Sequence, residues 1–153
     1  MSKRGSICDV KAKVNYPEHL RQLNDMLDFI YEDGFWDDWD SLGLDHERDL
    51  WAIEVMLTSQ PAAGAVIPGT GCLRKLRWGR DDKGKRGGLR IVYMYIPEIF
   101  IVYVFLVYGK SEKDDLSESG KKQLSKLASS IRARLLNRYL RKRARQDGEN
   151  DKV

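Results

Sequence analysis

The stretch from Val66 to Leu116 decides the fold, and it reads VIPGTGCLRKLRWGRDDKGKRGGLRIVYMYIPEIFIVYVFLVYGKSEKDDL. A basic segment over Cys72–Trp78 is followed by a loop of glycines and cations over Gly79–Gly88. Two apolar segments come next, Leu89–Ile96 and Phe100–Gly109. Near-continuous runs of valine, isoleucine and tyrosine are typical of strands that are buried on both faces. The stretch therefore predicts three strands, the last two of which form a hairpin.

The same stretch carries a dense group of positive charges. Its eight cationic side chains up to residue 90 are Arg74, Lys75, Arg77, Arg80, Lys83, Lys85, Arg86 and Arg90. The alternation of a strand over Cys72–Trp78 places Lys75 and Arg77 on one face, so the two side chains point the same way. Such an array beside a small sheet favours a polyanionic ligand over a small neutral metabolite.

Periodicity and turn residues predict the elements before this stretch. A first strand is expected over Phe29–Tyr31. A helix that ends at Gly43 would bury one face, formed by Phe35, Trp36, Trp39 and Leu42. A second helix is expected to begin near Asp45, a suitable N-cap residue, and to stop before Pro61.

The C-terminal part predicts one last helix, capped by Ser117. Its inward stripe would consist of Leu124, Leu127, Ala128, Ile131 and Leu135. Beyond the stripe, the sequence RKRARQDGENDKV is expected to fray. We therefore divide the chain into an N-terminal extension (1–24), a domain (25–135) and a basic, flexible tail (136–153).

Charge is distributed unevenly along the 153 residues, whose net charge is +4. Eleven acidic residues lie in Asp25–Glu54, against a single arginine, whereas Arg132–Arg145 holds seven basic residues. This polarity indicates one side that faces nucleic acid or the ribosome and an acidic opposite side. Pro97 and Glu98 interrupt the apolar run at its centre, which favours a hairpin over a membrane span. With no signal peptide visible, we expect a cytoplasmic protein.

Composition excludes several kinds of catalytic site. Two cysteines, Cys8 and Cys72, form neither a disulfide framework nor a zinc motif. The two histidines, His19 and His46, both lie outside the cationic array. A phosphate loop is excluded because Thr70 and the glycine after it stand where lysine and serine or threonine are required. We expect no metal and no cofactor.

The residues do permit cleavage of RNA without histidine or metal. Attack of a 2′-hydroxyl on its phosphate needs a proton acceptor, stabilisation of negative charge at phosphorus and a proton for the leaving oxygen. Arginine stabilises the charge, and a lysine crowded by cations has its pKa lowered, so that it can carry a proton. Lys75 beside Arg77 fits this pattern, and Tyr93, Tyr95 and Tyr108 are candidates to stack a base or donate a proton. Such a set works better when another body holds the RNA in line.

The chain resembles the RelE/HigB group of the RelE/ParE superfamily of bacterial toxins, and it is most similar to the HigB-like branch. The resemblance spans about Asp28 to Arg134, roughly two thirds of the chain. It is carried by Pro61, Gly64-Ala-Val-Ile-Pro-Gly-Thr-Gly71, Leu73-Arg-Lys-Leu-Arg-Trp78, Gly84-Lys-Arg-Gly-Gly88 with Arg90 and Tyr93, and Val107-Tyr-Gly-Lys110 with Glu112-Lys-Asp-Asp-Leu116.

The resemblance implies an α+β fold in which N-terminal helices and a C-terminal helix pack on a small antiparallel sheet. It implies a toxin of a type II toxin–antitoxin module, a metal-independent and ribosome-dependent endoribonuclease (an mRNA interferase) that inhibits translation. The catalytic candidates are Lys75, Arg77, Arg90, Lys110 and Lys113. The RNA-binding candidates are Arg74, Lys83, Lys85, Arg86 and Tyr93. In RelE proper the segment after the last strand is richer in arginine, and a tyrosine follows it. Here Ser111 and Ser117 occupy those positions. This difference favours the HigB-like branch and leaves the general acid and base open.

Two other functions remain open for this chain. A gyrase poison of the ParE type would have a similar fold and a protein target. An inactive relative would keep only RNA binding or antitoxin binding. For a toxin, the expected partners are the ribosome, mRNA and a cognate antitoxin, a helix-turn-helix DNA-binding protein, with no membrane involved.

Overall fold

The computed structural model describes residues 27–80, 84–109 and 116–151, and it gives the backbone but not the side chains of residues 80 and 84–87. The expectations for the N-terminal extension (1–24), for Lys83, and for Lys110 and Lys113 lie outside the described residues.

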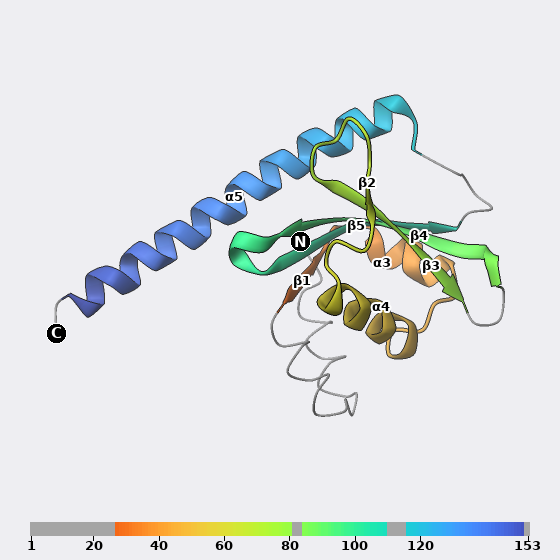
Figure 1. Ribbon diagram of the computed structural model, residues 1–153, viewed down its shortest axis with the longest axis horizontal. Helices are drawn as coiled ribbons and strands as arrows, with labels where there is room; N and C mark the ends of the chain where they lie inside the picture. The colour runs from red at the N-terminus through yellow and green to blue at the C-terminus, as the bar shows by residue number, and fades with distance from the viewer. Residues whose placement is uncertain (1–26, 81–83, 110–115, 152–153) are drawn as a thin grey trace.

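A five-stranded sheet with the order β1-β5-β4-β3-β2 forms the centre of the fold (Figure 1). Its strands are β1 (Asp28–Tyr31), β2 (Ala65–Val66), β3 (Leu73–Arg80), β4 (Gly84–Ile96) and β5 (Ile101–Gly109). Neighbouring strands are antiparallel, except that β1 runs parallel to β5. The predicted α+β class is confirmed, and the sheet is mixed rather than wholly antiparallel.

The three predicted strands of the decisive stretch are present, but the loop between the first two is shorter than expected. Instead of a loop over Gly79–Gly88, β3 continues to Arg80 and β4 already begins at Gly84, with these two residues paired. Glycine lacks a side chain to pack, but its backbone still pairs across a hairpin, so the ladder extends through it. The chain breaks between β4 and β5 where predicted, and there it forms the short 3-10 helix η1 (Pro97–Ile99).

Helices cover both faces of the sheet, so the central strands are buried on both sides. One apolar cluster joins α3 (Phe35–Ser41) and α4 (Arg48–Ser59) to one face, where Trp39 and Leu57 are fully buried. The other cluster joins Ile131 of α5 (Glu118–Asn150) to the opposite face. This two-sided burial explains why β4 and β5 have near-continuous apolar sequences.

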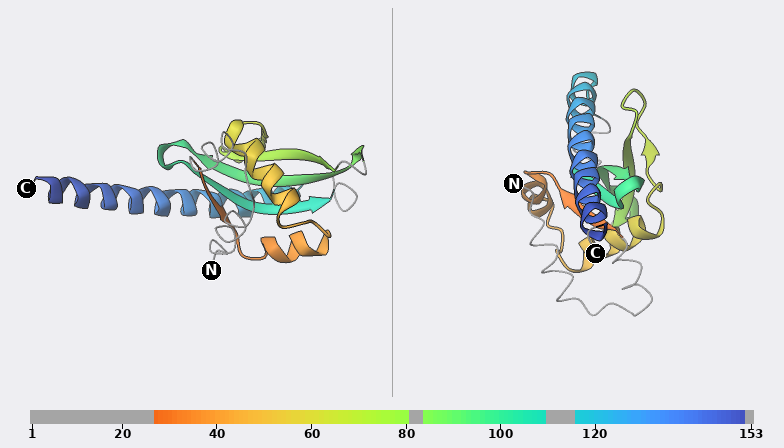
Figure 2. Two further views of the ribbon diagram at one scale, coloured as in Figure 1. Left: turned by 90° about the horizontal axis from the view of Figure 1, so that it is seen from below. Right: turned by 90° about the vertical axis from the view of Figure 1, so that its left-hand side faces the viewer.

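The C-terminal helix differs from the prediction at two points. Ala128 and Ile131 are buried, but Leu127 is 41% exposed, although it lies one helical turn before Ile131. The helix also runs to Asn150 where fraying was expected. Its C-terminal part projects away from the sheet (Figures 1 and 2).

Polar contacts fix the N-terminal half of α5 on the domain. The Ser117 hydroxyl accepts a hydrogen bond from the Gly120 N–H at 3.0 Å, which confirms the predicted cap. Farther along, Arg132 Nη2 donates to Glu98 Oε1 of η1 at 2.9 Å.

None of the helices in the described ranges is long and apolar enough to cross a membrane.

The start of α4 depends on one carboxylate. The helix begins at Arg48, three residues later than expected, yet Asp45 Oδ1 accepts hydrogen bonds from the N–H groups of Arg48 (2.7 Å) and Glu47 (2.8 Å). Hydrogen bonds from these N–H groups hold the pKa of the Asp45 carboxyl below its usual value, and the bond from Arg48 has the larger effect. Asp45 therefore performs the predicted capping role from outside the helix.

We expect Asp45→Ala to lower the free energy of unfolding by about 1 kcal/mol at neutral pH, because two helix N–H groups lose their acceptor. Since the pKa of Asp45 is lower in the folded state, its contribution is present above the ordinary carboxyl pKa and is lost as pH falls through the folded-state value. Urea titrations at neutral pH and below about pH 3 measure the difference. Glu149→Ala, at the far end of α5, is the control and should change stability little at either pH; a pH-independent effect of Asp45→Ala would contradict the charge argument.

Candidate nucleic-acid interface

Cationic side chains from two strands meet on the face of the sheet that α5 also covers. Arg77 of β3 is paired with Arg90 of β4, which is paired in turn with Tyr108 of β5. Lys75 lies two residues before Arg77 and therefore on the same face, about 7 Å away along the strand. The strand register thus brings together three of the five predicted catalytic residues.

Arg90 is the buried member of this group. The residue is 6% exposed, and its Nη1 donates a hydrogen bond to the Leu89 carbonyl oxygen at 3.3 Å. Within the described ranges no carboxylate forms an ion pair with it. A guanidinium has five donors, and burying such a charge without a counter-ion is unfavourable. The site is therefore suited to accept an anion beside Arg90.

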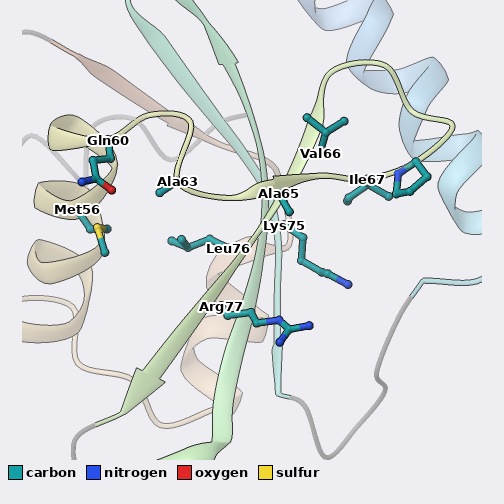
Figure 3. Close-up of a pocket in the computed structure, with 10 residues that line it drawn as sticks. Met56, Gln60, Ala63, Ala65, Val66, Ile67, Lys75, Leu76 and Arg77 are labelled. Atoms are coloured by element: carbon teal, nitrogen blue, oxygen red, sulfur yellow. The ribbon is translucent and has the colours of Figure 1, made fainter.

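Arg77 and Lys75 are the more accessible members, and they flank an open groove of about 610 Å³. Both side chains project to the same side of β3, away from Met56 and Gln60 of α4 (Figure 3). Apart from these two cations the groove lining is largely apolar and consists of Met56, Gln60, Ala63, Ala65, Val66, Ile67, Pro68 and Leu76. The apolar residues and the two cations thus lie on different sides of β3, along its outer edge.

Two of the predicted RNA-binding residues make structural contacts on the other face of the sheet. Arg74 lies on the opposite face of β3, where its Nη1 donates to the carbonyl oxygens of Gly64 (2.8 Å) and Ala62 (3.3 Å). Tyr93, its partner across the strands, is fully buried. The Tyr93 hydroxyl donates to the Pro61 carbonyl oxygen at 2.6 Å and accepts from the Gly64 N–H at 2.9 Å. Neither residue is placed to contact RNA from the cationic face.

These contacts attach the segment after α4 to the sheet. A Cβ atom added at Gly64 would lie 2.8 Å from Tyr93 Cε1 and 3.0 Å from the backbone carbonyl carbon of Lys75, so only glycine fits there. Burial raises the pKa of Tyr93, while the Gly64 N–H and the Arg74 charge act in the opposite direction. The hydroxyl is therefore held protonated as a donor to Pro61.

The remaining candidates are placed only in part. Lys85 and Arg86 lie on the described backbone of β4, but their side chains are not described. Tyr108 is buried next to Arg90, and sequence reasoning had named it only as one of three tyrosines, because the strand register that selects it was unknown. Among the described residues, no group of three or more histidine, cysteine, aspartate or glutamate residues is arranged to hold a metal.

No family model matches the chain. Among solved structures, a mutant of the E. coli toxin RelE in the free state is similar, with a TM-score of 0.42 and 20% sequence identity. The match covers 56% of this chain and 85% of that chain. A likeness of this strength carries no weight for function, which has to follow from the site itself.

The Tyr93 contacts give a direct test of the structural role. We expect Tyr93→Phe to lower the free energy of unfolding by about 1–3 kcal/mol, because the buried N–H of Gly64 and the half-buried carbonyl of Pro61 lose their partner. Gly64→Ala should be destabilising as well, since its methyl group would collide with the tyrosine ring. Urea denaturation measures both changes. Tyr139→Phe on the exposed surface of α5 is the matched control, and equal stability of the two phenylalanine variants would rule out the proposed role of the hydroxyl.

Proposed function

We propose that this protein is the toxin of a type II toxin–antitoxin module and cleaves mRNA on the ribosome without a metal ion. The observation that carries the proposal is the pairing of exposed Arg77 with buried Arg90, with Lys75 on the same face. Like charges directly opposite one another destabilise a sheet, so their placement is better explained by an anionic ligand than by stability. The family resemblance of the motif string supports the same function.

In the proposed reaction the 2′-oxygen of a nucleotide forms a bond to the adjacent phosphorus, and the bond from phosphorus to the 5′-oxygen breaks. The products are a 2′,3′-cyclic phosphate and a free 5′-hydroxyl. Arg77 and Arg90 stabilise the negative charge that builds up on the phosphate oxygens. In this proposal the Lys75 ammonium, on the same face as the two arginines, donates a proton to the leaving oxygen. Lys110 and Lys113 remain the candidates for removing the proton of the 2′-hydroxyl.

The groove supports a role in holding the substrate. Its lining includes two exposed apolar side chains, Met56 and Val66, which would contact a base near a phosphate on Lys75 and Arg77. These contacts do not orient a 2′-hydroxyl by themselves, and correct orientation accounts for a large share of catalysis in such reactions. The ribosome would provide it by holding the mRNA in line, which explains the proposed dependence on the ribosome.

We expect Arg77→Ala to slow single-turnover cleavage of ribosome-bound mRNA by about 100-fold, because one preorganised donor to the transition-state charge is lost. Lys75→Ala combined with Arg77→Ala should slow it further. Arg90→Lys keeps the positive charge but loses the planar guanidinium with its paired donors. This variant should remain folded but cleave more slowly than the wild type. Mapping of cut sites on translating ribosomes, with the same mRNA free in solution as a second substrate, measures these rates.

Lys122→Ala, an exposed lysine on α5, is the control and should cleave at the wild-type rate. Cuts at an unchanged rate in the double variant would show that the site is wrong. No cuts by the wild type, together with loss of DNA supercoiling in a gyrase assay, would identify a gyrase poison. No cuts, no effect on gyrase and no growth arrest on expression would identify an inactive relative.

The proposal includes a cognate antitoxin that masks the cationic face or restrains the fold. The positive charge of that face would attract an acidic segment of the partner. Co-expression with the neighbouring gene is expected to yield a complex that purifies as one species and does not cleave mRNA. Recovery of the toxin alone, fully active, would contradict this partner.

A further inference from the structure

The C-terminal part of α5 carries a continuous basic face. Arg134, Arg138, Arg141 and Arg145 recur at intervals of four, three and four residues and therefore lie on one side of the helix. They line, together with Asn137 and Lys142, a hollow of about 610 Å³ along the helix surface. We call these six residues the basic face. All of them are exposed, and this part of the helix stands clear of the sheet (Figure 2).

The basic face opposes the stability of its own helix. Arg134 and Arg138, and likewise Arg141 and Arg145, are separated by four residues, and each such pair of like charges costs roughly 0.2–0.5 kcal/mol. The last turn adds Asp147 and Glu149 with no basic residue, which is unfavourable at the negative end of the helix dipole. Packing against the domain does not offset these terms, since residues 137–151 are exposed. A bound polyanion would relieve the repulsion between the arginines.

The dimensions and chemistry of the face match the backbone of a nucleic-acid duplex. Eleven residues separate Arg134 from Arg145, or about 17 Å of helix, and a DNA duplex of that length carries about ten phosphates. Arginine binds phosphate through two parallel hydrogen bonds. The Asn137 amide can both donate a hydrogen bond to a 2′-hydroxyl and accept one from it. The exposed apolar residues of this region are Tyr139 and Leu140, too small an area for a membrane or protein docking surface.

We propose that the C-terminal part of α5 is an RNA-binding arm whose basic face grips the sugar–phosphate backbone of double-helical RNA. The arm is separate from the face that carries Arg77 and Arg90. Its contribution would be to anchor the protein to the RNA that surrounds the mRNA, not to take part in cleavage. The choice of RNA over DNA rests on the proposed function.

The test compares two triple variants of the full chain that lose the same charge. Arg138→Gln, Arg141→Gln and Arg145→Gln remove the basic face, whereas Lys122→Gln, Lys126→Gln and Arg143→Gln remove charge elsewhere on α5. Binding to a fluorescein-labelled RNA hairpin, and to a DNA hairpin of the same sequence, is followed by anisotropy over a range of salt. Circular dichroism confirms that both variants retain their helix content.

The basic-face variant is expected to raise the Kd for the RNA hairpin roughly 10–50-fold near 100 mM salt and to reduce the slope of log K against log salt by about 2–3. The control variant should bind within about threefold of the wild type, since phosphate contacts, not net charge, set the slope. Equal weakening in both variants would overturn the assignment of the face. Equally tight binding of the DNA hairpin by the wild type would overturn the assignment to RNA.

A cleavage assay separates this inference from the proposed function. At saturating protein, the basic-face variant should cut ribosome-bound mRNA at the wild-type rate, while Lys75→Ala with Arg77→Ala should lose cleavage and weaken hairpin binding less than the basic-face variant does. A wild type that binds the hairpin through the basic face but never cuts mRNA would refute the proposed function and leave the arm intact. Hairpin binding that survives removal of the basic face would refute the arm, whatever the cleavage assay shows.

Discussion

The pairing register of β4 with its two neighbours is the constraint on which the rest of the structure depends. Because β4 lies between β3 and β5, one register fixes both of its faces at once. It turns Tyr93 toward the α4 side, Met94 toward α5, and places Arg90 beside Arg77. A shift by one residue would exchange the two faces, which would turn Tyr93 away from Pro61 and Gly64 and separate Arg90 from Arg77. The core and the candidate site are therefore specified by the same hydrogen-bond ladder.

Neighbouring residues of the motif string have different roles in this fold, some structural and some in the candidate site. Pro61, Gly64, Arg74 and Tyr93 hold the segment after α4 against the sheet through backbone and side-chain hydrogen bonds. Lys75, between them in sequence, faces the other way. Alternation along a strand allows this division, because adjacent residues serve different faces. A basic strand can thus supply both the scaffold and the charges that the proposed chemistry needs.

Features that depend on local sequence patterns were predicted correctly, whereas features that depend on contacts between distant residues were not. The apolar strands and the Ser117 cap follow from composition and spacing, so they were predictable. The role of Tyr93 was not, because its partners lie about thirty residues away in a loop without periodicity. The tail forms a helix where fraying was predicted, because arginine, leucine and alanine have high helix propensity despite the run of like charges. Lys75, Arg77 and Arg90 were found by residue type, but only the register showed that they meet.

The shortness of β2 has a consequence for solubility. It pairs only with Arg74 and Lys75, so within the described part of the chain the outer side of β3 from Leu76 onward has no neighbouring strand. Unpaired backbone of this kind is a template for aggregation, which proteins deter with charged side chains. Arg77 would then keep copies of the chain apart as well as attract phosphate. Neutralising Arg77 would therefore favour self-association of the protein through this edge.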